Sequence, residues 1–281
     1  MENEVIAVQQ ADMLQAINRA EVDIQVATAK QYPRDVQASL NRIKTIATLD
    51  AETAEDCFYA LRRQGTLIEG VSVRLAEIIA GAWGNLRVQT RIVGNDGKTV
   101  TAQGICHDLE TNLAVSVEVK RRITDKQGRT FSEDMQVMTG NAASAIAFRN
   151  AVLKVVPKAV TKRVINEVKD VAVGKSMDLE SRRQNMLKYY STIGVTEKEI
   201  LAYCGVKAVG NIDASMIFEL SGLKNAIKEG TTTIQEAFRS NVADSNAQAE
   251  AARKKAEEAK EKATAGVDEA QARPAERRRN V

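Results

Sequence analysis

Lysine and arginine side chains are concentrated in two segments of this 281-residue chain, although its net charge is only +3. Residues 118 to 129 hold five basic against two acidic residues, and residues 141 to 169 hold six against one. Clustered cations neutralise the phosphates of a nucleic acid, and the counterions that are released provide affinity without reading the base sequence. The two segments therefore indicate a surface that can hold a nucleic-acid backbone. Their basic residues include Lys120, Arg122, Arg129, Arg149, Lys154 and Lys158.

Each basic segment also has a simpler structural interpretation. The Lys-Arg-Arg run at 120–122 is equally typical of a solvated strand face or of an edge strand protected against aggregation. Arg149 lies in sequence among apolar residues, so it can instead be the half-buried partner of a carboxylate. Only 4% of the residues are aromatic, which argues against a platform on which bases stack.

Three segments of alternating polarity must position the first basic segment, and they span residues 86–93, 100–107 and 115–123. Because side chains alternate between the two faces of a strand, Lys120 and Arg122 fall opposite the valines of their segment. A turn at residues 95–98 joins the first two segments. The pattern predicts an antiparallel three-strand meander with one apolar and one partly cationic face. Arg87 and Arg91 add two further basic residues in its first strand.

Helices are expected on both sides of this meander, which gives an α+β fold. An alanine-rich helix begins near Gly140, carries the second basic segment and must kink or restart at Pro157, whose ring removes a backbone donor. Before the strands, apolar spacing predicts three helices: one over 36–49, one that begins at Asp50 or Thr53 and ends at Gly65, and one that begins at Ser72.

Composition divides the chain into four expected parts. They are a polar helical arm (1–32), an α+β core with a helix-flanked β-β-β-α order (33–175), a separate small all-α module (176–240) and a charged tail (241–281). The helical module contains clear helix start and stop signals. Thr196 and Glu199 form a capping box at the start of one helix, and Gly205 follows its end. The tail lacks large apolar residues, so we expect it to be disordered or to form a transient single helix.

Catalytic and metal-binding patterns are weak in this sequence. It contains no GxxxxGK[ST] phosphate loop, which disfavours ATP-driven strand exchange. The single histidine, His107, precedes Asp108 and Glu110, but neighbouring strand residues point to opposite faces, so we expect a hydrogen-bonded turn histidine. Glu133 and Asp134 are interpreted as the solvated start of a strand, and not as a pair of nuclease carboxylates. We therefore expect no enzyme activity, no metal and no cofactor.

The cysteines and the N-terminus suggest a cytoplasmic protein. The three cysteines are far apart and form no CxxC pair, which is typical of a reducing compartment. The acidic N-terminal residues precede no signal-peptide core, and no apolar run approaches the roughly 20 residues that span a bilayer.

The order of helices, three-strand meander and long helix resembles that of the single-strand annealing proteins of bacteriophages, the RecT, Red-beta and Sak groups. The resemblance covers roughly residues 33 to 170 and rests on segments 86–93, 100–107, 115–123 and 141–152. It rests on element order and charge placement, because no catalytic signature defines these proteins. The module at 176–240 is more weakly similar to C-terminal modules of phage recombination proteins.

This resemblance implies a function and partners. Annealing proteins of this family bind single-stranded DNA in a groove of a ring or filament, hold the phosphates and leave the bases free to pair. The resemblance therefore implies ATP-independent binding and annealing of single-stranded DNA in phage recombination. It also implies that the protein self-associates and that a single-strand-binding protein or an exonuclease is a further partner. Carried onto this chain, the DNA contacts are the eight basic residues named above. The alternative is a non-enzymatic phage interaction or assembly protein, whose helical module binds a protein partner and whose basic face is incidental.

Overall fold

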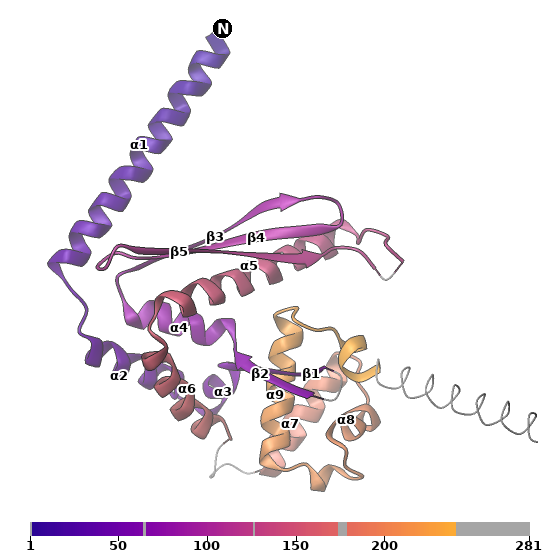
Figure 1. Cartoon of the computed structure of the whole chain (residues 1–281). Coiled ribbons are helices and arrows are strands. Elements are labelled where there is room, and N and C mark those ends of the chain that lie inside the picture. Colours follow the sequence, from indigo (N-terminus) through magenta and orange to yellow (C-terminus); the bar gives the residue numbers. More distant parts are fainter. Residues whose placement is uncertain (1, 64–65, 126, 174–178, 240–281) are drawn as a thin grey trace, which may run out of the picture. The chain divides into compact units, whose positions relative to one another are not determined.

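The computed structural model describes residues 2–63, 66–125, 127–173 and 179–239, which form an α+β fold with two small antiparallel sheets (Figure 1). Residues 1–233 make up one compact unit and residues 234–281 a second, whose described part holds the π-helical turn η2 (Gln235–Arg239). In chain order, the first unit contains α1 (Glu2–Gln31), α2 (Val36–Ala47), α3 (Ala51–Asp56), β1 (Phe58–Arg63), β2 (Thr66–Val71), α4 (Val73–Trp83), β3 (Leu86–Asn95), β4 (Thr99–Asp108), β5 (Leu113–Arg122), α5 (Glu133–Val155), α6 (Lys158–Val173), α7 (Leu179–Thr192), α8 (Glu197–Cys204), η1 (Val209–Asn211) and α9 (Ala214–Lys228).

The predicted three-strand meander is confirmed. Strands β3, β4 and β5 pair antiparallel in that order, with Gln103 of β4 opposite Arg91 of β3 and Glu118 of β5. The β3–β4 turn is held by Asp96, whose carboxylate accepts hydrogen bonds from the backbone N–H groups of Lys98 and Thr99. These bonds and the nearby Lys120 lower the pKa of Asp96 to about 2.

Helix α5 covers one face of this sheet, below the strands in Figure 1. Alternate β4 residues from Val100 to Asp108 are buried, and they meet small residues of α5 such as Ala143 and Ala147. At Gly104 the α5 backbone comes so close that a Cβ atom would collide with the carbonyl of Ala147. The alanine-rich pattern of α5 is thus explained by close helix-on-sheet packing. The predicted break at Pro157 is confirmed, because α5 ends at Val155 and α6 begins at Lys158. The expected start near Gly140 is wrong, because α5 already begins at Glu133, so Glu133 and Asp134 form its first turn and not a strand.

The expected second helix is wrong over most of its length. Asp50 caps α3 by accepting a hydrogen bond from the N–H of Thr53, but the helix ends at Asp56. The chain then forms the β1–β2 hairpin, in which Phe58 pairs with Val71. Its first strand is rich in aromatic and apolar residues that favour a buried strand, and α9 packs over it. The expected end at Gly65 lies outside the described residues.

The division of the helical module from the core at residue 175 is also wrong, because α9 belongs to the main core. Gly222 of α9 packs against Ala60 of β1, and Phe218 makes an edge-to-face ring contact with Phe58. The buried amide of Asn225 donates to the backbone carbonyls of Glu55 and Phe58. Local predictions inside the module are confirmed: the capping box at the start of α8 and the left-handed glycine at its end. The expected disordered tail, 241–281, lies outside the described residues.

Three further expectations concern the cap of α4, the N-terminal arm and membrane-spanning helices. Ser72 caps α4 as predicted, by accepting a hydrogen bond from the N–H of Leu75. The expected N-terminal arm is one continuous helix, α1, of 30 residues. Within the described ranges, none of the helices combines the length and the apolar character that crossing a bilayer requires.

Replacing Gly104 by alanine tests the close contact between α5 and β4. The new methyl group must push the α5 backbone off the sheet, and such overpacking costs typically about 1–3 kcal/mol of unfolding free energy. The matched control is Gly81→Ala, because a Cβ at this exposed position in α4 meets no atom within 4 Å. The control is expected to stabilise the protein by about 0.5–1 kcal/mol. Urea unfolding followed by circular dichroism measures both, and equal effects of the two variants would contradict the packing.

Candidate nucleic-acid interface

The sheet face turned away from α5 is the candidate interface, and we call it the outer face. Strand register and alternating burial assign its residues. On β3 they are Arg87, Gln89 and Arg91; on β4 Thr99, Thr101, Gln103, Ile105 and His107; on β5 Ala114, Ser116, Glu118, Lys120 and Arg122. The structure therefore brings four of the predicted contact residues onto one surface.

Positive charge dominates the outer face, with four basic residues against one acidic residue. Lys120 lies opposite Thr101 and Arg122 opposite Thr99, so each cation has a hydroxyl neighbour on β4. Among the described residues, Arg91, Lys120 and Arg122 form no hydrogen bond or ion pair and are exposed to solvent. Such cations are available to phosphates, and the neighbouring hydroxyl and amide groups can donate further hydrogen bonds to phosphate oxygens.

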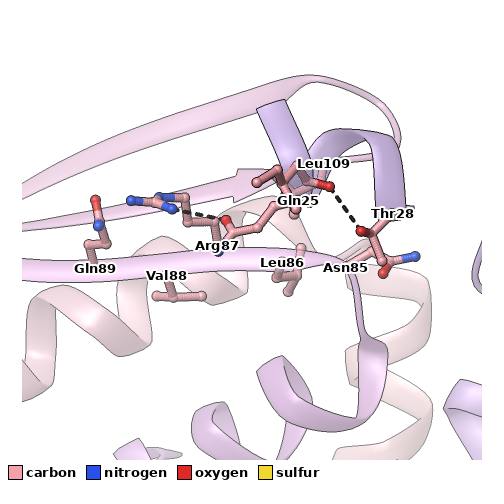
Figure 2. A pocket seen from close by; sticks show the side chains of 9 residues that line it. Gln25, Thr28, Asn85, Leu86, Arg87, Val88, Gln89 and Leu109 are labelled. Carbon is pink, nitrogen blue, oxygen red and sulfur yellow. Dashed lines mark hydrogen bonds between the residues drawn. The ribbon is translucent and has the colours of Figure 1, made fainter. Parts of the chain in front are cut away.

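The C-terminal part of α1 extends the outer face beside β3. Figure 2 shows Gln25 of α1 and Arg87 and Gln89 of β3 on one side of the strand, with Leu86 and Val88 on the other. The guanidinium of Arg87 donates a 2.9 Å hydrogen bond to the Gln25 amide oxygen. These side chains line a shallow pocket of about 530 Å³ together with Ile24, Thr28, Asn85 and Leu109. One end of the outer face is thus bordered by a helix.

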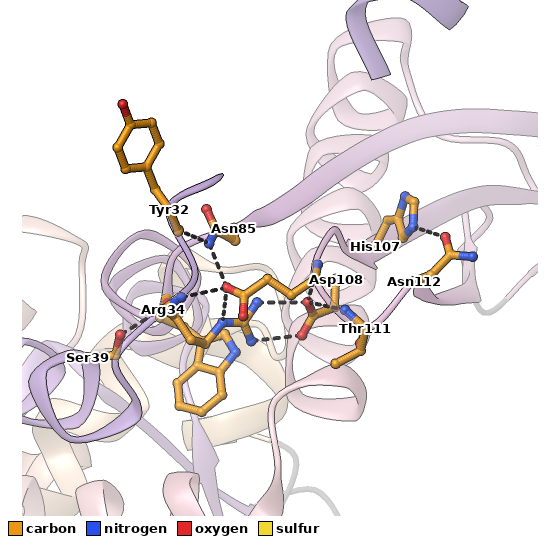
Figure 3. Close-up of polar contacts among 10 residues, drawn as sticks. Tyr32, Arg34, Ser39, Asn85, His107, Asp108, Thr111 and Asn112 are labelled. Atoms are coloured by element: carbon orange, nitrogen blue, oxygen red, sulfur yellow. Dashed lines mark hydrogen bonds and ion pairs between the residues drawn. The ribbon is translucent and has the colours of Figure 1, made fainter. Parts of the chain in front are cut away.

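A buried arginine fastens this helix to the sheet (Figure 3). Arg34, between α1 and α2, donates two 2.7 Å hydrogen bonds to the carboxylate of Asp108 at the end of β4. Its Nε and its backbone N–H both donate to Glu110, and its guanidinium lies 4.9 Å from the ring centroid of Trp83. Burial alone would raise the pKa of Asp108, but the bonds from Arg34 and from backbone N–H groups lower it below its ordinary value.

The expected position of the histidine in a turn is wrong, because His107 lies within β4, opposite Ala114 of β5. The Nε2 atom of His107 lies 3.0 Å from the Oδ1 atom of Asn112, within hydrogen-bond distance. Asp108 and Glu110 are both engaged by Arg34 instead. In the part of the chain that the structure describes, no three His, Cys, Asp or Glu side chains come together as a metal site.

Arg149 was misplaced by the sequence analysis, and the alternative interpretation is confirmed. This α5 residue is only 8% exposed, and its Nη1 atom lies 3.5 Å from a carboxylate oxygen of Glu229. Its guanidinium stacks 4.9 Å from the ring centroid of Tyr59. Burial raises the pKa of Glu229 despite the hydrogen bond from the N–H of Val73 and the charge of Arg149. Arg149 thus joins α5 to the end of α9 and does not reach the surface.

The remaining predicted contacts lie elsewhere. Arg129 is exposed in the loop after β5 and forms a 2.7 Å ion pair with Asp125. Lys154 and Lys158 are exposed, but they lie at the end of α5 and the start of α6. Because α5 packs against the inner face of the sheet, these lysines do not share a surface with Lys120. The predicted single basic surface is therefore split into an outer face and a separate basic stretch.

Sequence reasoning missed the polar residues that surround the cations. Thr99, Thr101 and Gln103 of β4 alternate with buried residues, so strand periodicity could have placed them beside Lys120. Gln25 gave no such signal, since its contact with Arg87 joins segments 62 residues apart.

Replacing Arg34 by methionine tests the anchor between α1 and the sheet. The change leaves the carboxylate of Asp108 buried without its cation, which costs about 3–5 kcal/mol of unfolding free energy. The control is Arg74→Met, whose ion pair with Glu77 is exposed and contributes under about 1 kcal/mol. Urea unfolding at several pH values measures both variants.

The effect of Arg34→Met is also expected to depend on pH. Because the folded pKa of Asp108 is lowered, the stability from its ionised form is present above the unfolded pKa of about 4 and is lost as the pH falls through the folded value. The difference between wild type and variant must shrink on acidification. A difference that is small at neutral pH, or independent of pH, would exclude this anchor.

Comparisons with known proteins leave the function to be argued from this geometry: no family model matches the chain, no curated protein is similar to it, and no solved structure matches it.

Proposed function

We propose that this protein binds single-stranded DNA on the outer face and anneals complementary strands without ATP, as the phage annealing proteins that its element order resembles do. The observation that supports this best is the outer face itself. On it, Arg91, Lys120 and Arg122 have no ion-pair partner among the described residues and lie among hydroxyl and amide groups, with Glu118 as the single carboxylate of this face. A surface of this kind favours an anionic partner such as a polyanion whose phosphates contact it, and its single carboxylate is too few to hold a metal ion.

The mechanism follows from what this surface offers. Lys120 and Arg122 point the same way about 7 Å apart along β5, so they can contact successive parts of one extended backbone. None of the outer-face residues is Phe, Tyr or Trp, so the surface holds phosphates without stacking the bases. The base edges then remain free to test a second strand. Binding is expected to be independent of sequence and sensitive to salt.

Self-association is part of the proposal. Strands β3 and β5 are the two edges of the three-stranded sheet and leave backbone groups unpaired there. A groove that continues from copy to copy would hold a longer stretch of DNA than a single outer face.

The outer-face assignment predicts a specific loss of salt-dependent binding. The variant Arg91→Gln, Lys120→Gln, Arg122→Gln removes three phosphate contacts, each of which contributes about 0.7 to the logarithmic salt slope for a single strand. We expect the slope to fall by about 2 and the affinity to fall at every DNA sequence, measured by fluorescence anisotropy. The matched control, Lys154→Gln, Lys158→Gln, Lys162→Gln, removes the same charge from exposed positions of α5 and α6.

The control is expected to retain the wild-type salt slope. Equal losses in both variants would mean that net charge, and no particular surface, binds the DNA. Full binding by the outer-face variant would remove the site assignment.

The annealing activity is tested separately with two complementary oligonucleotides that carry a fluorophore and a quencher. Without ATP, the wild-type protein is expected to accelerate annealing over the spontaneous rate, less so at high salt, and the outer-face variant to accelerate it little. Binding without acceleration would contradict the annealing activity and leave single-strand binding as the function. If the protein neither binds the strands nor accelerates annealing, that result would favour the second hypothesis, an interaction or assembly protein.

A further inference from the structure

His107 lies on the outer face, at the end that α1 borders. It is partly exposed on β4, opposite Arg87 of β3 on one side and Ala114 of β5 on the other. The Cβ atoms of directly opposite residues lie about 4.5–5.5 Å apart, so the side chains of Arg87 and His107 are neighbours on one surface. On the other side, the short side chain of Ala114 covers little of the imidazole.

A hydrogen bond from the turn after β4 determines which nitrogen of the imidazole is available (Figure 3). The Nε2 atom of His107 lies 3.0 Å from the Oδ1 atom of Asn112, which adopts a left-handed φ of 59°. An amide oxygen only accepts, so in the neutral ring Nε2 carries the proton and Nδ1 a lone pair. Among the described residues, Nδ1 has no hydrogen-bond partner. Nδ1 is therefore the atom that can take up a proton and donate it to a ligand.

The charge of this ring decides whether it can contact a phosphate. In the neutral ring, Nδ1 presents a lone pair to the phosphate oxygens, and these groups repel each other. In the protonated ring, Nδ1 presents an N–H while Nε2 stays bonded to Asn112, so a charge-assisted hydrogen bond can form. Histidine is the side chain whose charge ordinarily changes between about pH 5 and 8, and His107 is the single histidine of the chain.

The α1 end of the outer face is otherwise short of cations. Its one permanent cation is Arg87, which already donates a hydrogen bond to Gln25. The next basic residue on β3 lies four residues further along, about 14 Å away. Toward the β3–β4 turn lie the cations described above, Arg91, Lys120 and Arg122. A proton on His107 extends the cationic surface from this turn to α1.

Arg87 is the charged group that faces His107 most directly. Its positive charge opposes protonation of the imidazole in the free protein. A phosphate between the two side chains contacts both and removes this repulsion. Binding of a phosphate and binding of a proton at this position therefore reinforce each other, because such a coupling acts equally in both directions.

Carboxylates do not compensate the charge at this position. Arg34 engages both acidic residues that follow His107 in the sequence, Asp108 and Glu110. Glu118 of β5 shares the outer face, but it lies about 14 Å further along the strands. Helix α5 covers the opposite face of the sheet, and α1 reaches this end through the neutral amide of Gln25.

We infer that His107 is a further phosphate contact of the outer face, which together with Arg87 holds a phosphate of the bound strand when its imidazole is protonated. The inference rests on the proposed function, since the phosphate belongs to the single strand. Asn112 is a positioning residue that keeps Nδ1 turned to the ligand. Single-strand binding is then accompanied by uptake of a proton and becomes tighter under mildly acidic conditions.

Two substitutions fix the charge at this position and test the inference. His107→Gln carries no charge at any pH, and His107→Lys carries one throughout. The side chain is partly exposed, so both variants are expected to fold, which circular dichroism checks. Fluorescence anisotropy measures binding of a labelled oligothymidylate, whose bases do not titrate in this range, at about pH 8 and about pH 5.5 over a series of salt concentrations.

The wild-type protein is expected to gain one phosphate contact on acidification. Its logarithmic salt slope then rises by about 0.7, the contribution of one contact to a single strand. If the contact contributes nothing at about 1 M salt, this slope corresponds to about eightfold tighter binding at about 50 mM salt and about threefold at about 200 mM. His107→Gln is expected to keep the lower slope at both pH values, and His107→Lys the higher slope at both.

The controls separate this contact from other effects of pH. Lys154→Gln removes an exposed charge from α5, outside the outer face, and is expected to keep the wild-type pH dependence. Burial raises the pKa of Glu229, which lies beside Arg149 of α5 and not on the outer face. Any effect of Glu229 therefore remains in His107→Gln and is subtracted.

The outcomes distinguish a failure of this inference from a failure of the proposed function. A wild-type salt slope that does not change with pH, or one that changes equally in His107→Gln, would overturn the contact while single-strand binding itself persists. If the wild-type protein binds no single strand at either pH, the proposed function fails and the inference fails with it.

Discussion

The close packing of α5 on β4 is the contact on which the rest of the structure depends. It requires a glycine at position 104 and alanines on the helix, because the α5 backbone lies directly over the strand. This contact decides which face of the sheet is buried and which is open. Since side chains alternate strictly along a strand, burying one face fixes Arg91, Lys120 and Arg122 on the other. The cationic surface is therefore a consequence of small residues that carry no charge.

Buried and exposed basic residues have different surroundings in this fold. The buried arginines, Arg34 and Arg149, are paired with carboxylates and lie against aromatic rings, so they join elements and are not available to a ligand. Within the described part of the chain, Arg91, Lys120 and Arg122 of the outer face have no such partners, and the strands beside them supply mainly hydroxyl and amide groups. An unpaired arginine is costly when buried and harmless when solvated, which explains this division. The same division separates residues that shape the site from those that can bind a polyanion.

Much of this arrangement could be predicted, and the failures have physical reasons. Strand alternation correctly predicted the meander and the outer-face cations, and capping signals correctly predicted the start of α4 and both ends of α8. The β1–β2 hairpin was missed because the apolar residues of 58–61 fit a helix as well as a strand until α9 covers them. Arg149 was misassigned for a related reason: its partner Glu229 lies 80 residues further along the chain, and no local pattern reveals such a contact. The same holds for Gln25 and Arg87.

Cross-linking of bound DNA tests the central claim, that the outer face holds a single strand, most directly. An oligonucleotide that carries photoreactive azidophenacyl groups on phosphorothioates at several backbone positions would be bound, irradiated and digested with the protein, and the cross-linked peptides would be identified by mass spectrometry. The account predicts cross-links within β3 to β5, at outer-face positions of residues 86–122, that disappear at high salt. Cross-links confined to α6 or to the α7–α9 helices, with none on the sheet, would contradict it.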